Sequence, residues 1–218
     1  MHPGRFAAPK PSAVVHTATA KAGMVNAKGL WHKQGVMPPR TGHRPRPPLD
    51  AAQLDELALH YVGRFATSRS KLTAYLKRKL RERGWAGERD PDPELIAEKL
   101  AGLGYVDDAA FALGKARALS GRGYGARRVG QALYAAGISE EDGADARVLA
   151  VEARVDAALR LARRRRIGPF ASTPLAPAER EKAIAALIRA GHGSALARAL
   201  VHLPPGGVID EVALADLR

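Results

Sequence analysis

The chain of 218 residues contains no cysteine, and this absence excludes several kinds of site. Without thiols the protein has no disulfide framework, no thiolate metal site and no cysteine nucleophile, which fits a reducing, intracellular setting. The sequence also lacks any run of about 18 apolar residues and the apolar core of a secretory signal. We therefore expect a cytoplasmic protein with no membrane partner.

Residues that favour β-strands are scarce as well. Val, Ile and Thr together supply 25 residues, whereas Ala and Leu supply 67. Straight-chain residues and Ala favour helices, while β-branched residues favour strands. The composition therefore predicts an all-α protein.

Acidic residues are absent from the first 48 positions. This segment carries eight Lys or Arg and eight of the 15 prolines, in a chain whose net charge is +13. It shows no hydrophobic periodicity, which predicts a disordered, basic, proline-rich arm over 1–48. The arm is either a solvated extension or an accessory contact to nucleic acid. The overall charge favours an anionic partner, such as nucleic acid or an acidic protein surface.

Catalytic and metal-binding patterns are missing too. His60, His192 and His202 stand apart without the spacing of a zinc site, and we expect them to be structural. Acidic residues cluster only near the positions where helices are expected to start, and there they stabilise the helix dipole. These are Asp50, Asp92, Asp107, Asp108, Glu140 and Glu141. We expect no catalytic residue, metal or cofactor, so an enzyme such as a nuclease is the least favoured class.

The stretch SGRGYGARRV, residues 120–129, has nearly the glycine spacing of a dinucleotide-binding loop. That loop follows a β-strand, whereas the Ala-rich residues 108–119 predict a helix. We therefore interpret the stretch as a turn between two helices, in which glycine permits a tight path.

Hydrophobic residues recur at helical spacing from Leu49 onwards. Asp50, Asp107 and the pair Asp92–Pro93 are typical of helix starts. The pattern predicts further helices at about 69–83, 126–136, 177–190 and 194–203, and a capping box at 139–142 that opens another.

The segments LRERGW (80–85), LYAAGI (133–138) and LIRAGH (187–192) each read Leu-x-x-x-Gly, and their leucines are separated by 53 and 54 residues. Equal separations indicate a tandem repeat. We expect three three-helix units of helix-turn-helix type, in series as an elongated, curved body. Their expected ranges are 49–106, 107–150 and 151–203, followed by a C-terminal tail, 204–218.

Each unit carries basic residues near its first turn or second helix. Such a face is either only solvated or part of a strip that follows an acidic polymer, and its recurrence favours the strip. The expected contact residues are Lys77, Arg78, Arg81, Lys115, Arg117, Arg122, Arg127, Arg128, Arg163, Arg164, Arg165 and Arg166. Tyr124 is the only aromatic residue close to a basic turn, so we expect base stacking to be minor.

Several motifs together resemble the RecX family of bacterial recombination regulators. The strongest are LGYVDDAAF at 103–111 and GARRVxxxL at 125–133, with RRRRIGPF at 163–170 and LIRAGHGSALARALV at 187–201. The resemblance covers about residues 50–203. It implies tandem three-helix repeats, no catalytic activity, and binding in the groove of the RecA–DNA filament. It also implies inhibition of strand exchange, ATP hydrolysis and co-protease action, in DNA repair and the SOS response.

Two hypotheses follow. The first is a monomeric negative regulator of RecA that contacts the filament and, without sequence specificity, its single- or double-stranded DNA. The alternative is a stand-alone DNA- or RNA-binding helical repeat protein. Binding to naked DNA, compared with binding to recombinase-coated DNA, discriminates between them.

Overall fold

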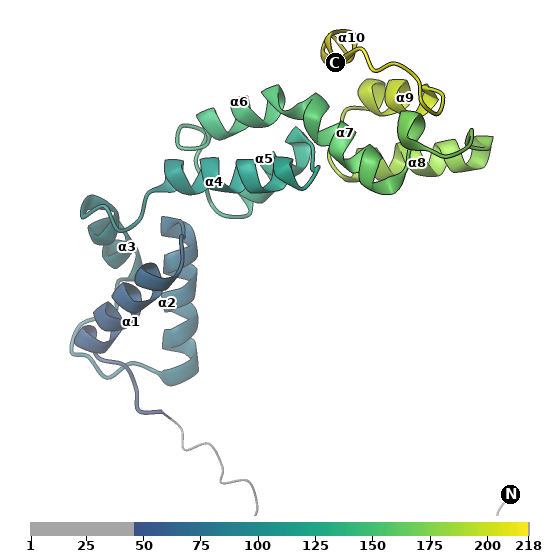
Figure 1. Ribbon diagram of the computed structural model, residues 1–218. Coiled ribbons are helices and arrows are strands. Elements are labelled where there is room, and N and C mark those ends of the chain that lie inside the picture. Colours follow the sequence, from purple (N-terminus) through teal and green to yellow (C-terminus); the bar gives the residue numbers. More distant parts are fainter. Residues whose placement is uncertain (1–45, 218) are drawn as a thin grey trace, which may run out of the picture. The chain divides into compact units, whose positions relative to one another are not determined.

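The computed structural model describes residues 46–217, so the arm predicted for 1–48 lies almost entirely outside the described residues. Helices make up the described part (Figure 1), and the all-α prediction is confirmed there. Within it, the only β-type pairing is an isolated bridge between Leu49 and Trp85. None of the helices in 46–217 is long and apolar enough to cross a membrane. The α-helices are α1 (Ala51–Arg64), α2 (Arg69–Arg83), α3 (Pro93–Gly102), α4 (Asp108–Gly121), α5 (Ala126–Tyr134), α6 (Ala144–Glu152), α7 (Arg154–Arg165), α8 (Pro177–Arg189), α9 (Ser194–His202) and α10 (Glu211–Ala215), with a short 3-10 helix, η1 (Gly168–Phe170).

Side-chain caps start several of these helices. Asp50, Asp92 and Asp107 each accept a hydrogen bond from a backbone N–H of the first turn, in α1, α3 and α4. Ser68 does the same at the start of α2. The helix starts predicted at the three aspartates are therefore confirmed. A cap of this type typically contributes about 1 kcal/mol to stability.

The capping box predicted at 139–142 is wrong. Residues 140–143 form a turn, and α6 begins only at Ala144. Ser139 Oγ accepts a hydrogen bond from the Asp142 backbone N–H at 2.9 Å. The Asp142 carboxylate, however, accepts hydrogen bonds from Ser139 Oγ at 2.7 Å and from Arg69 Nη2 at 3.0 Å. Asp142 is thus held by Arg69 and does not return to cap the backbone at Ser139.

Three separate hydrophobic clusters stabilise the described part. One lies among α1–α3 and centres on Leu72 and Leu76, which are fully buried. The second lies among α4–α6, around Val129 and Leu133, and the third among α7–α9, around Leu187. Burying one such side chain contributes about 1.5–3 kcal/mol. Helix α10 packs onto the third cluster through Leu214.

The first two clusters are joined where the turn after α5 meets the start of α2. Ser68 Oγ donates a hydrogen bond to the Ala136 carbonyl at 2.6 Å. Gly137 has φ +68°, and a Cβ there would lie 2.3 Å from the Cβ of Ser70. Glycine is therefore required at this junction by both its backbone conformation and the close approach.

The second and third clusters are joined in the same way, where the turn after α8 meets the start of α5. The Gly125 N–H donates to the Ala190 carbonyl at 2.9 Å. Gly191 has φ +96°, and a Cβ there would lie 2.5 Å from the backbone nitrogen of Arg128. In each junction, the turn that follows one helix (α5 or α8) packs against the first turn of an earlier helix (α2 or α5).

Candidate interaction surface

The basic residues of α2 are partly neutralised by nearby carboxylates. Lys77 forms an ion pair with Glu94 of α3, and Arg78 pairs with Glu82 at 3.6 Å. The hydrogen bond from Lys79 lowers the pKa of the Glu82 carboxyl, which keeps this carboxyl ionised. Arg81 is exposed. This face therefore presents less positive charge than its sequence indicates.

On α4, the two predicted contact residues differ in environment. Lys115 is half-buried beside a cavity of about 430 Å³ that Phe111 and Tyr105 also line. Arg117 is exposed. The structure therefore leaves Arg117 more accessible than Lys115 to a large partner.

The turn between α4 and α5 meets the basic end of α7. Arg164 Nη1 donates a hydrogen bond to the Arg122 carbonyl at 2.8 Å. The guanidinium of Arg163 lies over the ring of Phe170, 4.9 Å from its centroid. Arg122 and Arg163–Arg166 are all exposed, and we call these five residues the arginine cluster.

The arginine cluster is more strongly basic than the face of α2. Within 46–217, none of its five members forms an ion pair with a carboxylate. The end of α7 tolerates this charge because the negative end of the helix dipole lies there. The cluster therefore offers five exposed guanidinium groups to an anionic ligand.

The start of α5 carries two more exposed predicted residues, Arg127 and Arg128. The first turn of α5 contains no acidic residue. No ion pair to either arginine occurs in the described part of the chain. Their charges are therefore also available to a partner.

The glycine-rich stretch at 120–129 is a turn between helices, as predicted, since α4 ends at Gly121 and α5 begins at Ala126. Gly123 has φ +81°, and a Cβ on Gly125 would lie 2.3 Å from the Gly191 carbonyl oxygen. The Gly125 N–H is already bonded to the Ala190 carbonyl. The glycines thus allow two turns to pack closely, and the backbone does not form a phosphate loop.

His192 belongs to this packed pair of turns. Its side chain is 2% exposed, and its Nε2 lies 3.0 Å from the Gly123 carbonyl oxygen, to which it donates a hydrogen bond. Burial lowers the pKa of His192, because the charged imidazolium is poorly solvated there. The structural role expected for this histidine agrees with its position.

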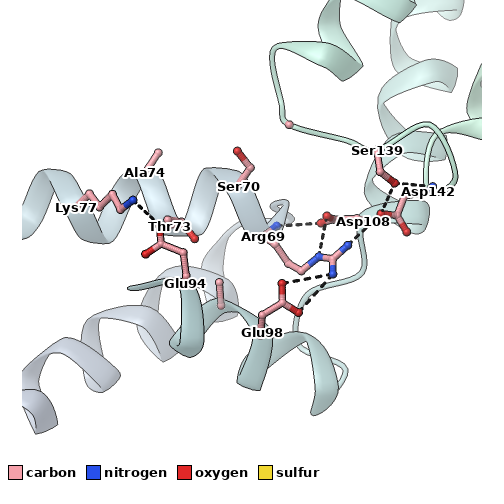
Figure 2. A pocket seen from close by; sticks show the side chains of 12 residues that line it. Arg69, Ser70, Thr73, Ala74, Lys77, Glu94, Glu98, Asp108, Ser139 and Asp142 are labelled. Atoms are coloured by element: carbon pink, nitrogen blue, oxygen red, sulfur yellow. Dashed lines mark hydrogen bonds and ion pairs between the residues drawn. The ribbon is translucent and has the colours of Figure 1, made fainter. Parts of the chain in front are cut away.

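Sequence reasoning missed the most connected charged residue, Arg69 at the start of α2 (Figure 2). Its backbone N–H and its Nε donate to the two carboxylate oxygens of Asp108, at 2.9 and 3.0 Å. Nη2 lies 3.0 Å from Asp142 Oδ2, and Nη1 lies 3.4 Å from Glu98 Oε2. The hydrogen bond to Asp108 raises the pKa of Arg69 above its usual value. Its position in the sequence indicated that Asp108 only stabilises the dipole of α4. The structure shows that Asp108 also binds Arg69 of α2.

The Arg69 network lines a pocket of about 640 Å³ between the start of α2, α3 and the 139–142 turn (Figure 2). Its carboxylates are occupied by Arg69 and Lys77, which leaves no free acidic set for a cation. Among the described residues, no group of three or more His, Asp or Glu side chains is placed to hold a metal ion. The Arg69 network therefore joins α2 to α3, to α4 and to the 139–142 turn.

Comparison with known proteins places the chain among its relatives. The protein named "Regulatory protein RecX" from Myxococcus xanthus is 32% identical over 170 residues, which are 74% of this chain and 90% of that protein. The chain belongs to the RecX family. The resemblance noted in the sequence motifs is therefore confirmed.

Solved RecX structures were also found. RecX from Lactobacillus salivarius covers 69% of this chain and 93% of its own, with a TM-score of 0.50 and 20% identity, and it shares the helical fold. A structure described as regulatory protein RecX covers 66% of this chain and 67% of its own, at 26% identity and a TM-score of 0.48. No family model matches the chain.

Proposed function

We propose that this RecX-family protein is a negative regulator of the RecA recombinase. It binds in the groove of the RecA–DNA filament as a cytoplasmic monomer, and it inhibits strand exchange, ATP hydrolysis and co-protease action. The observation that carries the proposal is the family membership, supported by the exposed, unpaired arginines of the second and third clusters. A filament of recombinase on DNA supplies phosphates and carboxylates over a long surface, and these arginines complement such a surface.

The proposed contacts are the basic residues predicted from the sequence. Arginine is suited to this role because its planar guanidinium pairs with phosphate or carboxylate through two hydrogen bonds. We rank these residues by their exposure and by the carboxylates near them. The arginine cluster, Arg127 and Arg128 are then the principal contacts. Lys77, Arg78, Arg81, Lys115 and Arg117 contribute less, because the α2 face is partly neutralised and Lys115 is half-buried.

Binding to naked DNA, compared with binding to RecA-coated DNA over a range of salt concentrations, tests the proposal. We expect tighter binding to the coated form. The variant with Arg163→Gln, Arg164→Gln and Arg165→Gln should lose affinity for the filament. The matched control, Lys77→Gln, Arg78→Gln and Arg81→Gln, removes the same charge from the neutralised face and should lose less. Equal effects of the two variants would contradict this weighting.

The alternative remains a nucleic-acid-binding repeat protein whose target is the DNA or RNA alone. It predicts equal affinity for naked and coated DNA and no effect on strand exchange. Its log–log salt slope for Z phosphate contacts would be about −0.9Z for duplex DNA and −0.7Z for single strands. This pattern, with strand exchange unchanged, would reject the regulator proposal.

A further inference from the structure

The outer face of α5 combines an aromatic ring with basic side chains. Tyr134 is 85% exposed, which makes it the most exposed aromatic residue in the described part of the chain. Successive helical residues turn by about 100°, so Arg127, Gln131 and Tyr134 fall on one face. All three side chains lie outside the hydrophobic cluster around Val129 and Leu133.

The charge at the start of α5 differs from that of the equivalent helices in the other two clusters. At the start of α2, Arg69 is neutralised by three carboxylates. The first turn of α8 contains Glu179. The first turn of α5 has Arg127 and Arg128 and no acid, at the positive end of the helix dipole. Positive side chains at the positive end of the dipole repel it and destabilise α5. A bound anion would reduce this repulsion.

A pocket beside the start of α5 is also positively charged. It has a volume of about 430 Å³, and its charged lining residues are Arg127 and Arg154, with no carboxylate. His192 also lines it; its Nε2 is used by Gly123, whereas the buried Nδ1 has no hydrogen-bond partner. This nitrogen is enclosed by the protein, so the pocket offers an anionic ligand its positive charge and not the His192 ring.

We propose that the outer face of α5 binds a single-stranded nucleic acid, with an unpaired base stacked on Tyr134 and neighbouring phosphates paired with Arg127 and Arg128. Exposed aromatic rings in basic grooves are the usual stacking platforms for unpaired bases. In a duplex, the faces of the bases are covered by their neighbours, so the ring selects the single-stranded form. This inference rests on the proposed function and deepens it by naming the strand form and the residue that recognises it.

The proposal differs from the expectation that stacking is minor. That expectation considered Tyr124, which lies in the basic turn itself and is 36% exposed. Tyr134 is distant from the turn in sequence, yet two helical turns bring it onto the face of Arg127. Tyr and Arg also dominate protein–protein contacts, so a protein surface on this face is the competing outcome.

Oligonucleotides with and without bases test the stacking. The full chain is titrated into labelled oligo(dT) of about 16 nucleotides, an abasic strand of the same length, and a duplex, with fluorescence anisotropy as the readout. We expect Tyr134→Ala to weaken binding to oligo(dT) by about tenfold, as for a lost stacking contact, and to leave abasic binding unchanged. Tyr134→Phe should restore wild-type affinity. Tyr105→Ala, an exposed tyrosine elsewhere, is the matched control and should have no effect.

Two results would overturn the proposal: oligo(dT) affinity unchanged in Tyr134→Ala, or an equal loss for the abasic strand. Inhibition of RecA ATPase by the same variants separates the inference from the proposed function. If Tyr134→Ala keeps its oligo(dT) affinity but no longer inhibits, α5 contacts the recombinase and the stacking proposal is wrong. If wild-type protein stacks bases through Tyr134 but never inhibits RecA, the proposed function is wrong and the stacking proposal stands.

Discussion

Arg69 occupies the first position of α2 and bonds carboxylates from three other segments, namely α3, α4 and the 139–142 turn. Its most buried partner is Asp108, whose side chain is 5% exposed. A buried carboxylate without its cation is costly, whereas an exposed ion pair contributes little. At the residue scale, this network should therefore matter more for stability than the three ion pairs made by the other residues of α2.

We predict that Arg69→Ala lowers the free energy of unfolding by about 1–3 kcal/mol, the usual cost of leaving a buried hydrogen-bonding group without its partner. The value should lie toward the low end, because the Arg69 side chain is 36% exposed and solvent screens it. Arg69→Lys should restore little, since one ammonium group cannot reach three carboxylates. Urea denaturation measures both. Lys77→Ala, which breaks an exposed pair, is the control; an equal loss in this control would contradict the prediction.

His192 makes stability depend on pH. Its pKa is lowered in the folded protein by burial, so as pH falls the unfolded chain takes up this proton first. The stabilisation is complete above the unfolded value of about 6.5 and is lost as pH falls below it, by at most about 1.4 kcal/mol per pH unit. His192→Gln can still donate to the Gly123 carbonyl and cannot titrate. We predict a shallower decline between pH 7 and 5 for this variant, and parallel unfolding curves would contradict it.

At the scale of elements, the sequence predicted correctly those helix starts that are fixed by a hydrogen bond within the same helical turn. Asp50, Asp92 and Asp107 start helices because each carboxylate caps an N–H within its own first turn. The 139–142 segment carries a similar signal, yet its carboxylate is held by Arg69, which is 73 residues away in sequence. The Lys77–Glu94 pair could not be predicted from the sequence either, because Lys77 lies on α2 and Glu94 on α3. The Leu-x-x-x-Gly repeat was visible, but the contacts made by its glycines depend on the neighbouring cluster.

The junction turn at Gly191 allows a controlled test of this packing, with Gly104 in the turn after α3 as the reference. Gly191 and Gly104 both have positive φ, at +96° and +78°, but only Gly191 faces a neighbour that a Cβ would strike. Gly104→Ala therefore incurs only the backbone cost of about 1–2 kcal/mol. We predict that Gly191→Ala is more destabilising than Gly104→Ala by a further 1–3 kcal/mol or so, as for an overpacked site. Thermal unfolding measures the stability of both variants. An equal loss of stability would contradict the prediction, because it would mean that the junction rearranges to accommodate the added methyl group.

At the scale of the whole molecule, the distribution of unpaired charge matters more than the net charge of +13. The family, the helical fold and the list of basic residues could be derived from sequence. Which basic residues are neutralised could not, because the carboxylate partners come from other helices. The structure leaves the arginine cluster, Arg127 and Arg128 unpaired within 46–217, while Arg69 and Lys77 are paired.

The salt dependence of binding should report this difference. Each lost phosphate contact reduces the log–log salt slope for single-stranded DNA by about 0.7. We predict that Arg163→Gln with Arg165→Gln reduces the slope by about 1.4 if both arginines contact phosphates. Lys77→Gln with Arg78→Gln should reduce it by less, because both side chains already pair with carboxylates. Anisotropy titrations from 50 to 200 mM salt, roughly the range over which such effects are large, measure the slopes. A larger change in the second pair would contradict the weighting.

The ATPase activity of RecA on single-stranded DNA tests the central claim most directly, since it requires the filament as the target. We predict that the full chain inhibits hydrolysis in a concentration-dependent way. We also predict that Arg163→Gln, Arg164→Gln and Arg165→Gln together weaken this inhibition more than the matched Lys77, Arg78 and Arg81 replacements. Hydrolysis that stays unchanged at saturating wild-type protein would contradict the account.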